Sequence, residues 1–449
     1  MKSQADLVIR NASLCHLGGK TGDVAISAGK ILSAGPRVPG SAKKEIDAAG
    51  LLLSPGFIDS HVHLNEPGRT AWEGLSTGTK ALAAGGVTAF FDMPLNSSPP
   101  ATDAAQLARK REAALKKSWI DFGLWGGLVP GNEDQIAGLA RAGAIGIKAF
   151  MCGSGLEEFP ASDKKTILRG AKACAANDLV LAFHAEDPAE LARFAKKQIG
   201  RDWRAYAASR PESVEVKAVR TAIAAAAETG CKIHIVHISS PEAVGLVAEA
   251  RRKGIDATCE ACTHYLVFDE SAMETRGAAA KCSPPLRPAA TRAELRDLLR
   301  SGQIHTIGSD HSPAPPSMKT GGDFFKIWGG ISGAQHAMRF FWRLAEQEKI
   351  PLRRIVELTS AAPARRFGLI GKGTLARGAD ADIVLLRRTA DTPVTRAELF
   401  TRHKITPYLG LPLDLRVETT IVRGAIVYHK GAHRNGPAGM QVRRNPPQQ

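Results

Sequence analysis

Two histidines, His61 and His63, end a short apolar run that begins at Phe57. Residues two apart on a strand point to the same face, so the two imidazoles are expected to lie side by side. Neutral imidazole is the commonest side-chain metal ligand in proteins, and the pair therefore suits one metal ion. The same pair also fits two ordinary histidines of the surface or the core. A metal site requires further ligands at the ends of other strands.

Between residues 54 and 368, apolar strands and helical segments alternate strictly. Such alternation is typical of βα units built around a parallel sheet. Helices are predicted over residues 72–84, 104–117, 132–142, 164–176, 241–254 and 291–302, with Asp103 as a suitable N-cap of the second. Eight βα units can be counted, from FIDSHVH in the first strand to IHTIGSDHSP in the eighth. They predict an α/β protein with a (β/α)8 TIM-type barrel.

Short alternating strands, punctuated by Gly and Asn turns, precede and follow the predicted barrel. Two β segments that flank a barrel in sequence can pair in space, because chain termini often lie close together. We therefore expect a small β-sandwich domain formed by residues 1–53 and 369–449. The barrel domain is expected over residues 54–368.

The composition is ordinary for a folded globular protein, with 44% hydrophobic and 23% charged residues. The formal net charge is +16, from 60 Lys and Arg against 44 Asp and Glu. These basic residues are spread along the predicted helices, and no basic run is interleaved with aromatic residues, so we expect no nucleic-acid partner. No stretch resembles a membrane span, which predicts no membrane partner. The final residues, HRNGPAGMQVRRNPPQQ, predict a mobile basic tail.

The N-terminal residues lack the basic start and long apolar core of a secretory signal. Seven cysteines, an odd number scattered among apolar neighbours, fit reduced thiols better than a disulfide framework. Together these features predict a cytoplasmic location. The CEAC motif at residues 259–262 resembles half of a zinc site, but no second CxxC exists, so buried thiols are expected there.

Polar residues stand at the ends of several predicted barrel strands. Active sites of such barrels are built at the C-terminal strand ends. The residues in this position are His61, His63, Lys148, His184, His237 and Asp310. Each has an ordinary structural interpretation, as a core histidine bonded to the backbone or as a cap of the following loop. Their joint placement at one rim favours a shared site.

Two further histidines serve as a comparison. His234 lies three residues before His237, so on a regular strand it points to the opposite face and is expected to pack under the helices. His264, near the end of the seventh strand, is expected to be a structural residue behind the rim.

Lys148 lies in an apolar strand, where a charged lysine is rarely buried without a partner. It is either an amine with a depressed pKa or a lysine converted to a carboxylate-like group that joins two metals.

The rim residues lie within sequence blocks that run in order along the chain. The blocks are HVHLNEPGRTAWEG, DMPLNS, GIKAFM, FHAED, HIVHISSPE, CTHYLVF, KCSPPLR, GSDHSP and FKIWGGISG. From about residue 5 to residue 428 the chain resembles the allantoinases, within the amidohydrolase superfamily of cyclic amide hydrolases. This resemblance implies a binuclear metal centre. In it His61, His63 and Asp310 hold one ion, His184 and His237 hold the other, and carbamylated Lys148 (N6-carboxylysine) bridges them.

The implied cofactors are two divalent metal ions per chain, expected to be zinc, although such ligands also accept manganese, cobalt or iron. Two close metals lower the pKa of a shared water, so that hydroxide forms near neutral pH, and they polarise the substrate carbonyl. Asp310 is the expected catalytic residue, which takes the proton of the attacking hydroxide and passes it to the leaving ring nitrogen.

The substrate is a small molecule, and Asn65 bears on which one. In dihydroorotase the corresponding residue is an arginine that binds the substrate carboxylate, whereas the amide here suits a neutral ureido compound such as allantoin, which would be opened to allantoate. Asn96 and Ser283 are candidates for binding the ring or the ureido group, or are turn residues. The alternatives are a dihydroorotase, a dihydropyrimidinase or hydantoinase, or a non-catalytic scaffold protein; the six retained ligands argue against the last.

Other expectations concern the surroundings of the site. Glu66 and Arg69 are expected to order the loop after the metal histidines, and Gly329 and Gly330 to mark a loop near the mouth. Resemblance to multimeric relatives suggests a homo-oligomer, specifically a homotetramer.

Overall fold

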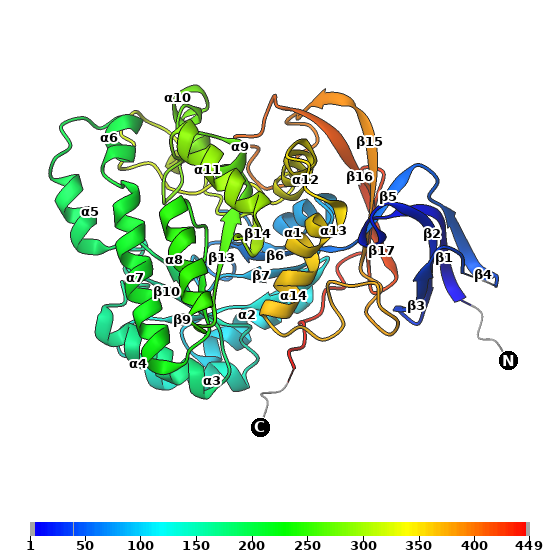
Figure 1. The fold of residues 1–449 in the computed structure, drawn as a ribbon, viewed down its shortest axis with the longest axis horizontal. Coiled ribbons are helices and arrows are strands. Elements are labelled where there is room, and N and C mark those ends of the chain that lie inside the picture. The colour runs from blue at the N-terminus through cyan, green and yellow to red at the C-terminus, as the bar shows by residue number, and fades with distance from the viewer. Residues whose placement is uncertain (1–4, 39, 446–449) are drawn as a thin grey trace.

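The computed structural model describes residues 5–38 and 40–445, and its larger part is a closed barrel of eight parallel strands (Figure 1). The strands are β6 (Phe57–Val62), β7 (Val87–Asp92), the consecutive β8 (Asp121–Leu124) and β9 (Gly126–Leu128), β10 (Ile147–Phe150), β11 (Leu181–His184), β12 (Ile233–Ile235), β13 (Ala257–Cys262) and β14 (Thr306–Gly308). A parallel bridge between Val62 and His311 joins the first strand to the residues after the last. The predicted barrel is confirmed.

Helices follow the strands where the sequence predicts them. They are α1 (Leu75–Ala84), α2 (Ala104–Lys117), α3 (Ile136–Arg141), α4 (Lys164–Ala176), α8 (Pro241–Arg252) and α11 (Ala289–Arg300). Asp103 caps α2 by accepting a hydrogen bond from the Gln106 backbone at 2.8 Å. Helix α1 begins three residues later than predicted because the Glu66 carboxylate accepts from the Leu75 N–H, at 2.9 Å.

Other helices lie in the long connections and were not predicted. Between β11 and β12 the chain forms α5 (Pro188–Ala195), α6 (Trp203–Ala208) and α7 (Glu212–Thr229), and β13 is followed by α9 (Thr263–Val267), α10 (Ala272–Thr275) and the short turn η3 (Gly277–Ala280). After β14 come η4 (Pro316–Met318), α12 (Ala337–Gln347), α13 (Leu352–Val356) and α14 (Ala362–Arg366). The loops between these elements form much of the wall of the site described below.

The two ends of the chain meet in one nine-stranded sheet beside the barrel (Figure 1). Its strands are β1 (Ala5–Leu14), β2 (Lys20–Ser27), β3 (Lys30–Gly35), β4 (Ala42–Asp47), β5 (Leu51–Pro55), β15 (Ile383–Pro393), β16 (Pro412–Val422), β17 (Ala425–His429) and β18 (Ala432–His433). Antiparallel pairing of β5 with β15 joins the N-terminal to the C-terminal strands. The predicted pairing is therefore confirmed, whereas the domain limits at residues 53 and 369 stay a prediction.

Strand β15 shows how the sheet is attached to the barrel. Successive side chains of a strand point to opposite faces. Ile383 and Leu385 pack in a core among the strands of the sheet, whereas Val384 and Leu386 belong to the large cluster that fills the barrel and its helices. One face of the sheet is thus covered by the barrel.

The C-terminal segment is ordered against the barrel as far as Asn445, so the predicted mobile tail is wrong over residues 433–445. The Phe122 N–H donates to the Met440 carbonyl at 2.9 Å, and the Val442 N–H donates to the Phe122 carbonyl at 2.8 Å. The Asn445 N–H donates to the Gly368 carbonyl at 2.8 Å. The tail is held because its backbone pairs with barrel strand β8. Residues 446–449 lie outside the described residues.

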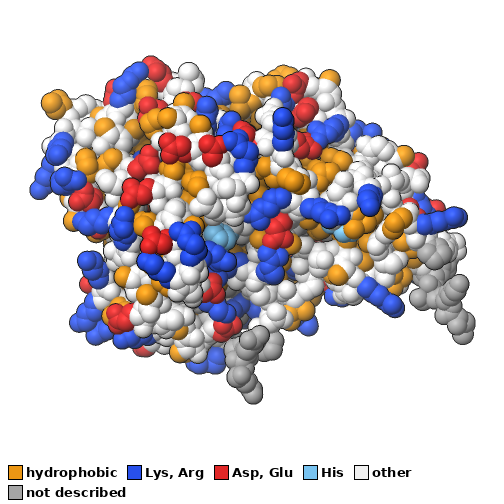
Figure 2. Space-filling model, viewed as in Figure 1, with side chains coloured by type: hydrophobic (Ala, Val, Ile, Leu, Met, Phe, Trp, Pro, Cys, Tyr) orange, Lys and Arg blue, Asp and Glu red, His pale blue; other side chains and the backbone are white. Residues whose placement is uncertain are grey.

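The surface charges and the cysteines do not point to a further site. Lys and Arg side chains are scattered over the face seen in Figure 2, with acidic side chains between them. In residues 5–38 and 40–445 no helix combines the length and apolarity needed to cross a bilayer. All seven cysteines, including Cys259 and Cys262 of the CEAC motif, are buried and unpaired.

A buried ion cluster ties the sheet to the barrel. The Lys372 ammonium lies 2.5 Å from Asp121 at the start of β8, 2.7 Å from Asp382 next to β15, and 3.0 Å from Asp380. Arg423, after β16, pairs with the other oxygen of Asp121. Lys372 therefore supplies much of the positive charge that balances the buried carboxylates of this group.

We predict that Lys372→Met lowers the free energy of unfolding by about 3–5 kcal/mol, because buried carboxylates are left without their counter-charge. Urea unfolding followed by circular dichroism measures the change. Lys43→Met is the matched control, since Lys43 forms an exposed ion pair with Asp6 and its loss is expected to leave the unfolding midpoint unchanged. Equal midpoints for wild type and Lys372→Met would contradict a stabilising role of the cluster.

Candidate metal centre

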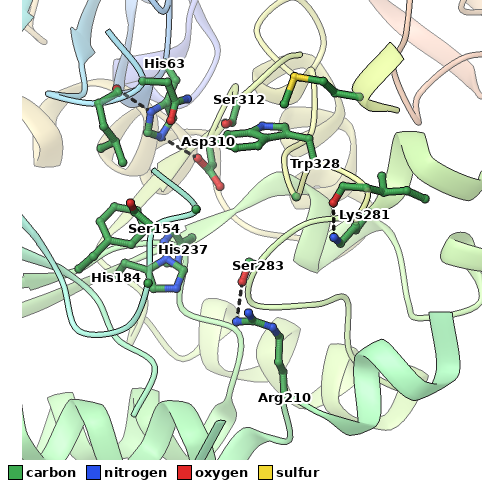
Figure 3. A pocket seen from close by; sticks show the side chains of 18 of the residues that line it. His63, Ser154, His184, Arg210, His237, Lys281, Ser283, Asp310, Ser312 and Trp328 are labelled. Carbon is green, nitrogen blue, oxygen red and sulfur yellow. Dashed lines mark hydrogen bonds and ion pairs between the residues drawn. The ribbon is translucent and has the colours of Figure 1, made fainter. Parts of the chain in front are cut away.

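The C-terminal ends of the barrel strands open into a cavity of about 360 Å³ (Figure 3). Five of the six predicted rim residues line it, namely His61, His63, His184, His237 and Asp310. The sixth, Lys148, is completely buried on β10. The volume of the cavity lies near the lower end of the range of about 300–1,000 Å³ for small-molecule sites. The structure therefore brings these residues to one small cavity.

The first group joins the ends of β6 and β14. The Asp310 Oδ1 atom lies 3.3 Å from His61 Nε2 and 3.5 Å from His63 Nε2. The other ring nitrogens face acceptors, with His61 Nδ1 at 2.9 Å from Glu260 Oε1 and His63 Nδ1 at 3.0 Å from the Leu95 carbonyl. Because these oxygens accept, each Nδ1 carries a hydrogen, and each Nε2 faces Asp310. Such outer partners fix the tautomer that binds a metal ion.

The second group joins the ends of β11 and β12. His184 Nδ1 lies 3.0 Å from His237 Nε2, while His184 Nε2 lies 2.7 Å from Glu186 Oε2. Phe150 stacks on the His184 ring with centroids 4.5 Å apart. Burial lowers the pKa of both His184 and His237, so both imidazoles are neutral at pH 7. Neutral imidazole is the form that binds metal.

Lys148 lies on β10, in the barrel wall next to β11, which ends in His184. In the described part of the chain its buried Nζ atom makes no hydrogen bond. Burial lowers its pKa to about 7, against the pull of the Asp310 and Glu260 charges. This direction agrees with the first of the two forms predicted for Lys148, an amine with a depressed pKa. A large share of the amine is therefore neutral near pH 7, and the neutral amine is the form that adds carbon dioxide to become a carbamate.

Asp310 is held ionised despite its burial. Burial alone would raise its pKa, but the His61 charge and a hydrogen bond from His63 keep the pKa well below its usual range. The backbone is strained at this point, since Asp310 has φ 42° and His237 has φ 40°. Non-glycine residues held in the left-handed region are characteristic of functional sites.

The donor set fits divalent metal ions. It combines imidazole nitrogens with a carboxylate, a combination typical of zinc and other transition-metal sites. Among the described residues, the ligand atoms of His61, His63 and Asp310 lie within 4.8 Å of one another. The unpartnered, buried Lys148 nitrogen requires an explanation, and conversion to a carbamate would make it a metal ligand.

Glu260 supports the first group and was missed in the sequence. Its carboxylate is fully buried on β13 and also accepts a hydrogen bond from Ser60 at 2.6 Å. A Cβ atom on Gly308 would lie 2.6 Å from the Glu260 Cδ atom, so residue 308 must be glycine for this carboxylate to fit. The sequence feature that could have indicated its role is a glutamate inside an apolar strand, within the CEAC motif.

Glu186 and Arg210 form a second supporting pair that was also missed. Glu186 Oε2 accepts from Arg210 at 2.6 Å and from Ser283 at 3.0 Å, in addition to its contact with His184. Burial opposes its ionisation, yet the Arg210 charge holds the pKa of Glu186 well below its usual range. Arg210 is thus neutralised within the wall of the cavity. The signal for Glu186 was its position in the FHAED block.

The three predicted substrate-binding residues differ in position. Asn96 and Ser283 line the cavity, whereas Asn65 is fully buried and is absent from its lining. The Asn65 amide donates to the Pro313 carbonyl at 3.4 Å and accepts from Asn96 at 3.1 Å. Asn65 has φ 64°, which turns its side chain into these contacts. Its geometry supports Asn96 rather than direct contact with a ligand.

Both comparison histidines lie away from the cavity. His234 is buried, with its Nδ1 at 2.7 Å from Thr258 and its ring against Phe367, as predicted. His264 is buried beside Tyr265, and neither of its ring nitrogens has a hydrogen-bond partner in the described residues.

Other expectations about the surrounding loops agree with the structure. Arg69 donates to the Asn96 carbonyl at 3.0 Å and pairs with Glu158, so it does order this loop. Gly329 lines the mouth.

Comparison with known proteins agrees with this geometry. A model described as "Amidohydrolase family" matches residues 52–427. An allantoinase of Deinococcus radiodurans is 46% identical over 447 residues, which cover 98% of each chain, and an allantoinase of Rubrobacter xylanophilus is 44% identical over 445 residues with the same coverage. The solved structure of an L-hydantoinase (dihydropyrimidinase) from Arthrobacter aurescens superposes with a TM-score of 0.95 at 30% identity, covering 98% of this chain and all of the other.

We predict that Glu260→Ala weakens metal retention by about 10- to 100-fold, because His61 loses the partner that fixes its tautomer and ring orientation. Metal analysis after titration with a competing chelator measures this. Glu249→Ala, which removes an exposed carboxylate on α8, is the matched control and is expected to retain metal like the wild type. Wild-type retention in Glu260→Ala would exclude the supporting role.

Proposed function

The chain belongs to the amidohydrolase family, and we propose that it hydrolyses the hydantoin ring amide of allantoin to give allantoate. The observation that carries this proposal is the convergence of four histidines, Asp310 and an unpartnered buried lysine at one small cavity. The relatives named allantoinase, which match nearly the whole chain, support the choice of substrate. A cyclic amide of this size is compatible with the cavity volume.

In this proposal the rim residues hold two divalent ions. His61, His63 and Asp310 would hold one, His184 and His237 would hold the other, and Lys148, as N6-carboxylysine, would be a further ligand. When bound, such a pair of ions lowers the pKa of a water to near neutrality and polarises the ring carbonyl. Zinc is the expected metal, and manganese, cobalt and iron fit the same donors.

The chain's own residues supply proton transfer and orientation. Asp310 is ionised, so its carboxylate accepts the proton that the attacking water loses and delivers it to the ring nitrogen that leaves. Asn96 and Ser283 line the cavity and offer an amide and a hydroxyl to the ring. Contacts to Asn65 and to Glu186 hold these two side chains in place.

Unsubstituted hydantoins or dihydropyrimidines are the second candidate substrates. The superposition on the L-hydantoinase (dihydropyrimidinase) structure favours them, but its 30% identity is lower than the identity to the allantoinases. A homotetrameric state and a cytoplasmic location remain predictions from the sequence.

Ring opening by metal-replete protein tests the substrate. Allantoin, dihydroorotate and unsubstituted hydantoin are compared in parallel, with a chelated sample as control. We expect preferential, chelator-sensitive conversion of allantoin to allantoate. Preferential turnover of hydantoin or dihydroorotate would overturn the substrate, and a metal-loaded protein inactive on all three would overturn the proposed function.

Asp310→Asn is predicted to lower kcat for ring opening by about 10²- to 10⁴-fold, because an amide can neither accept nor return the proton. Steady-state kinetics give the rate, and metal analysis of the same sample separates proton transfer from metal loss. A variant that keeps its metal and retains near-normal kcat would remove Asp310 from the proton-transfer role.

A further inference from the structure

Four lysines are buried among residues 5–38 and 40–445, and three of them are accounted for. Lys110 pairs with Asp92 at 3.0 Å, Lys372 is enclosed by aspartates, and Lys148 lies at the proposed metal centre. The fourth, Lys281, is only 4% exposed and lines the cavity. Within the described part of the chain, no carboxylate lies within 4.0 Å of its Nζ atom. Buried charges are normally paired, so this cation requires an acceptor.

The surroundings of Lys281 leave its charge uncompensated. Its ammonium donates one hydrogen bond, to the Ile327 carbonyl, and lies 4.6 Å from the centre of the Tyr206 ring. Arg210 lies on the same ring at 5.5 Å, but Glu186 neutralises it. Burial and the nearby Arg210 charge lower the pKa of Lys281 to about 8, so it is still mostly protonated at pH 7. An ammonium has three donors, and at least one remains for a ligand.

The wall that carries Lys281 is fixed. The Lys319 ammonium donates to the carbonyls of Ala278 at 3.0 Å and Trp328 at 2.9 Å, and also to Gly330. The Gly330 N–H donates to the Lys281 carbonyl at 2.9 Å. These bonds join the loop after η3 to the loop that precedes α12. These hydrogen bonds hold the backbone of Lys281 in a fixed position at the cavity wall.

Its position relative to the metal centre indicates which part of the substrate it faces. Figure 3 shows Lys281 across the cavity from His184 and His237, with Ser283 between them. The amide that is hydrolysed must lie at the histidines. Lys281 then faces the opposite end of the bound molecule. In allantoin that end can carry the ureido substituent, whose carbonyl oxygen is a strong neutral hydrogen-bond acceptor.

We propose that Lys281 is a specificity-determining residue that donates a hydrogen bond to the ureido carbonyl oxygen of the substrate. This assignment rests on the proposed function and extends it, because it explains how a substituted hydantoin is distinguished from the bare ring. A site built to hydrogen-bond a polar group discriminates strongly against an analogue that lacks it. The bare ring has no acceptor at this end and leaves the ammonium without a ligand.

The test compares Lys281→Met with the wild type on allantoin, on unsubstituted hydantoin and on hydantoin-5-acetate, whose substituent is anionic. Each hydantoin is assayed as a substrate, or as a competitive inhibitor of allantoin opening where its turnover is below detection. We expect kcat/KM for allantoin to fall about 10- to 100-fold, while the value or inhibition constant for hydantoin changes less than about twofold. Lys281→Arg, which keeps the charge, is expected to preserve the preference for allantoin over hydantoin.

Lys326→Met is the matched control, since Lys326 is an exposed lysine at the rim of the same cavity. It is expected to behave like the wild type on every compound, which separates a directed hydrogen bond from the general positive charge of the mouth. Thermal unfolding and metal content of each variant identify a folding defect. Such a defect in Lys281→Met, with equal losses on allantoin and hydantoin in both Lys281 variants, would show a structural role and overturn the proposal.

The remaining outcomes separate this proposal from the proposed function. If the wild type opens hydantoin but not allantoin, the proposed function fails and the ureido contact fails with it. If the wild type opens allantoin and Lys281→Met is selectively impaired on hydantoin-5-acetate, only the Lys281 assignment is overturned, because the residue then binds a carboxylate. Selective loss on allantoin supports both.

Discussion

Closure of the barrel between its first and last strands is the constraint on which the site depends. His61 and His63 end β6, and Asp310 follows β14 about 250 residues later in the chain, yet their ligand atoms lie within 4.8 Å. The closing contacts are specific: the His63 N–H donates to the His311 carbonyl at 2.7 Å, and the Ser309 N–H donates to the Asp59 carboxylate at 3.1 Å. A shift in this register would separate the histidines from the carboxylate.

Burial sets the ionisation of the same residues. It keeps His184 and His237 neutral and a large share of Lys148 deprotonated near pH 7, whereas neighbouring histidines and hydrogen bonds keep Asp310 ionised. The site therefore offers neutral imidazoles, a free amine and a carboxylate at once. Metal binding and carbamate formation both require these forms. The outer carboxylates, Glu260 and Glu186, hold the imidazoles in the orientation that this chemistry needs.

The sequence was sufficient for the barrel and for the six rim residues, because the alternation of apolar strands with helices and the polar residues at strand ends carry that information locally. It was insufficient for side chains whose role depends on distant contacts. The burial of Asn65 follows from its positive φ and from partners at residues 96 and 313. The ordered tail depends on pairing with β8, and Lys281 became informative only when its lack of a carboxylate partner in the described residues was visible. None of these contacts has a local signature.

Two cations of the cavity wall, Arg210 and Lys281, differ in their partners and therefore in their roles. Arg210 and Lys281 flank the same Tyr206 ring, but Arg210 is paired with Glu186 and so acts on His184 through that carboxylate. Lys281 has a backbone carbonyl and an aromatic face beside it, but no carboxylate of the described residues lies within 4.0 Å. A paired cation stabilises the wall, whereas an unpaired one raises the free energy of the empty cavity. Binding of an acceptor relieves that cost, so the residue favours ligands that bring one.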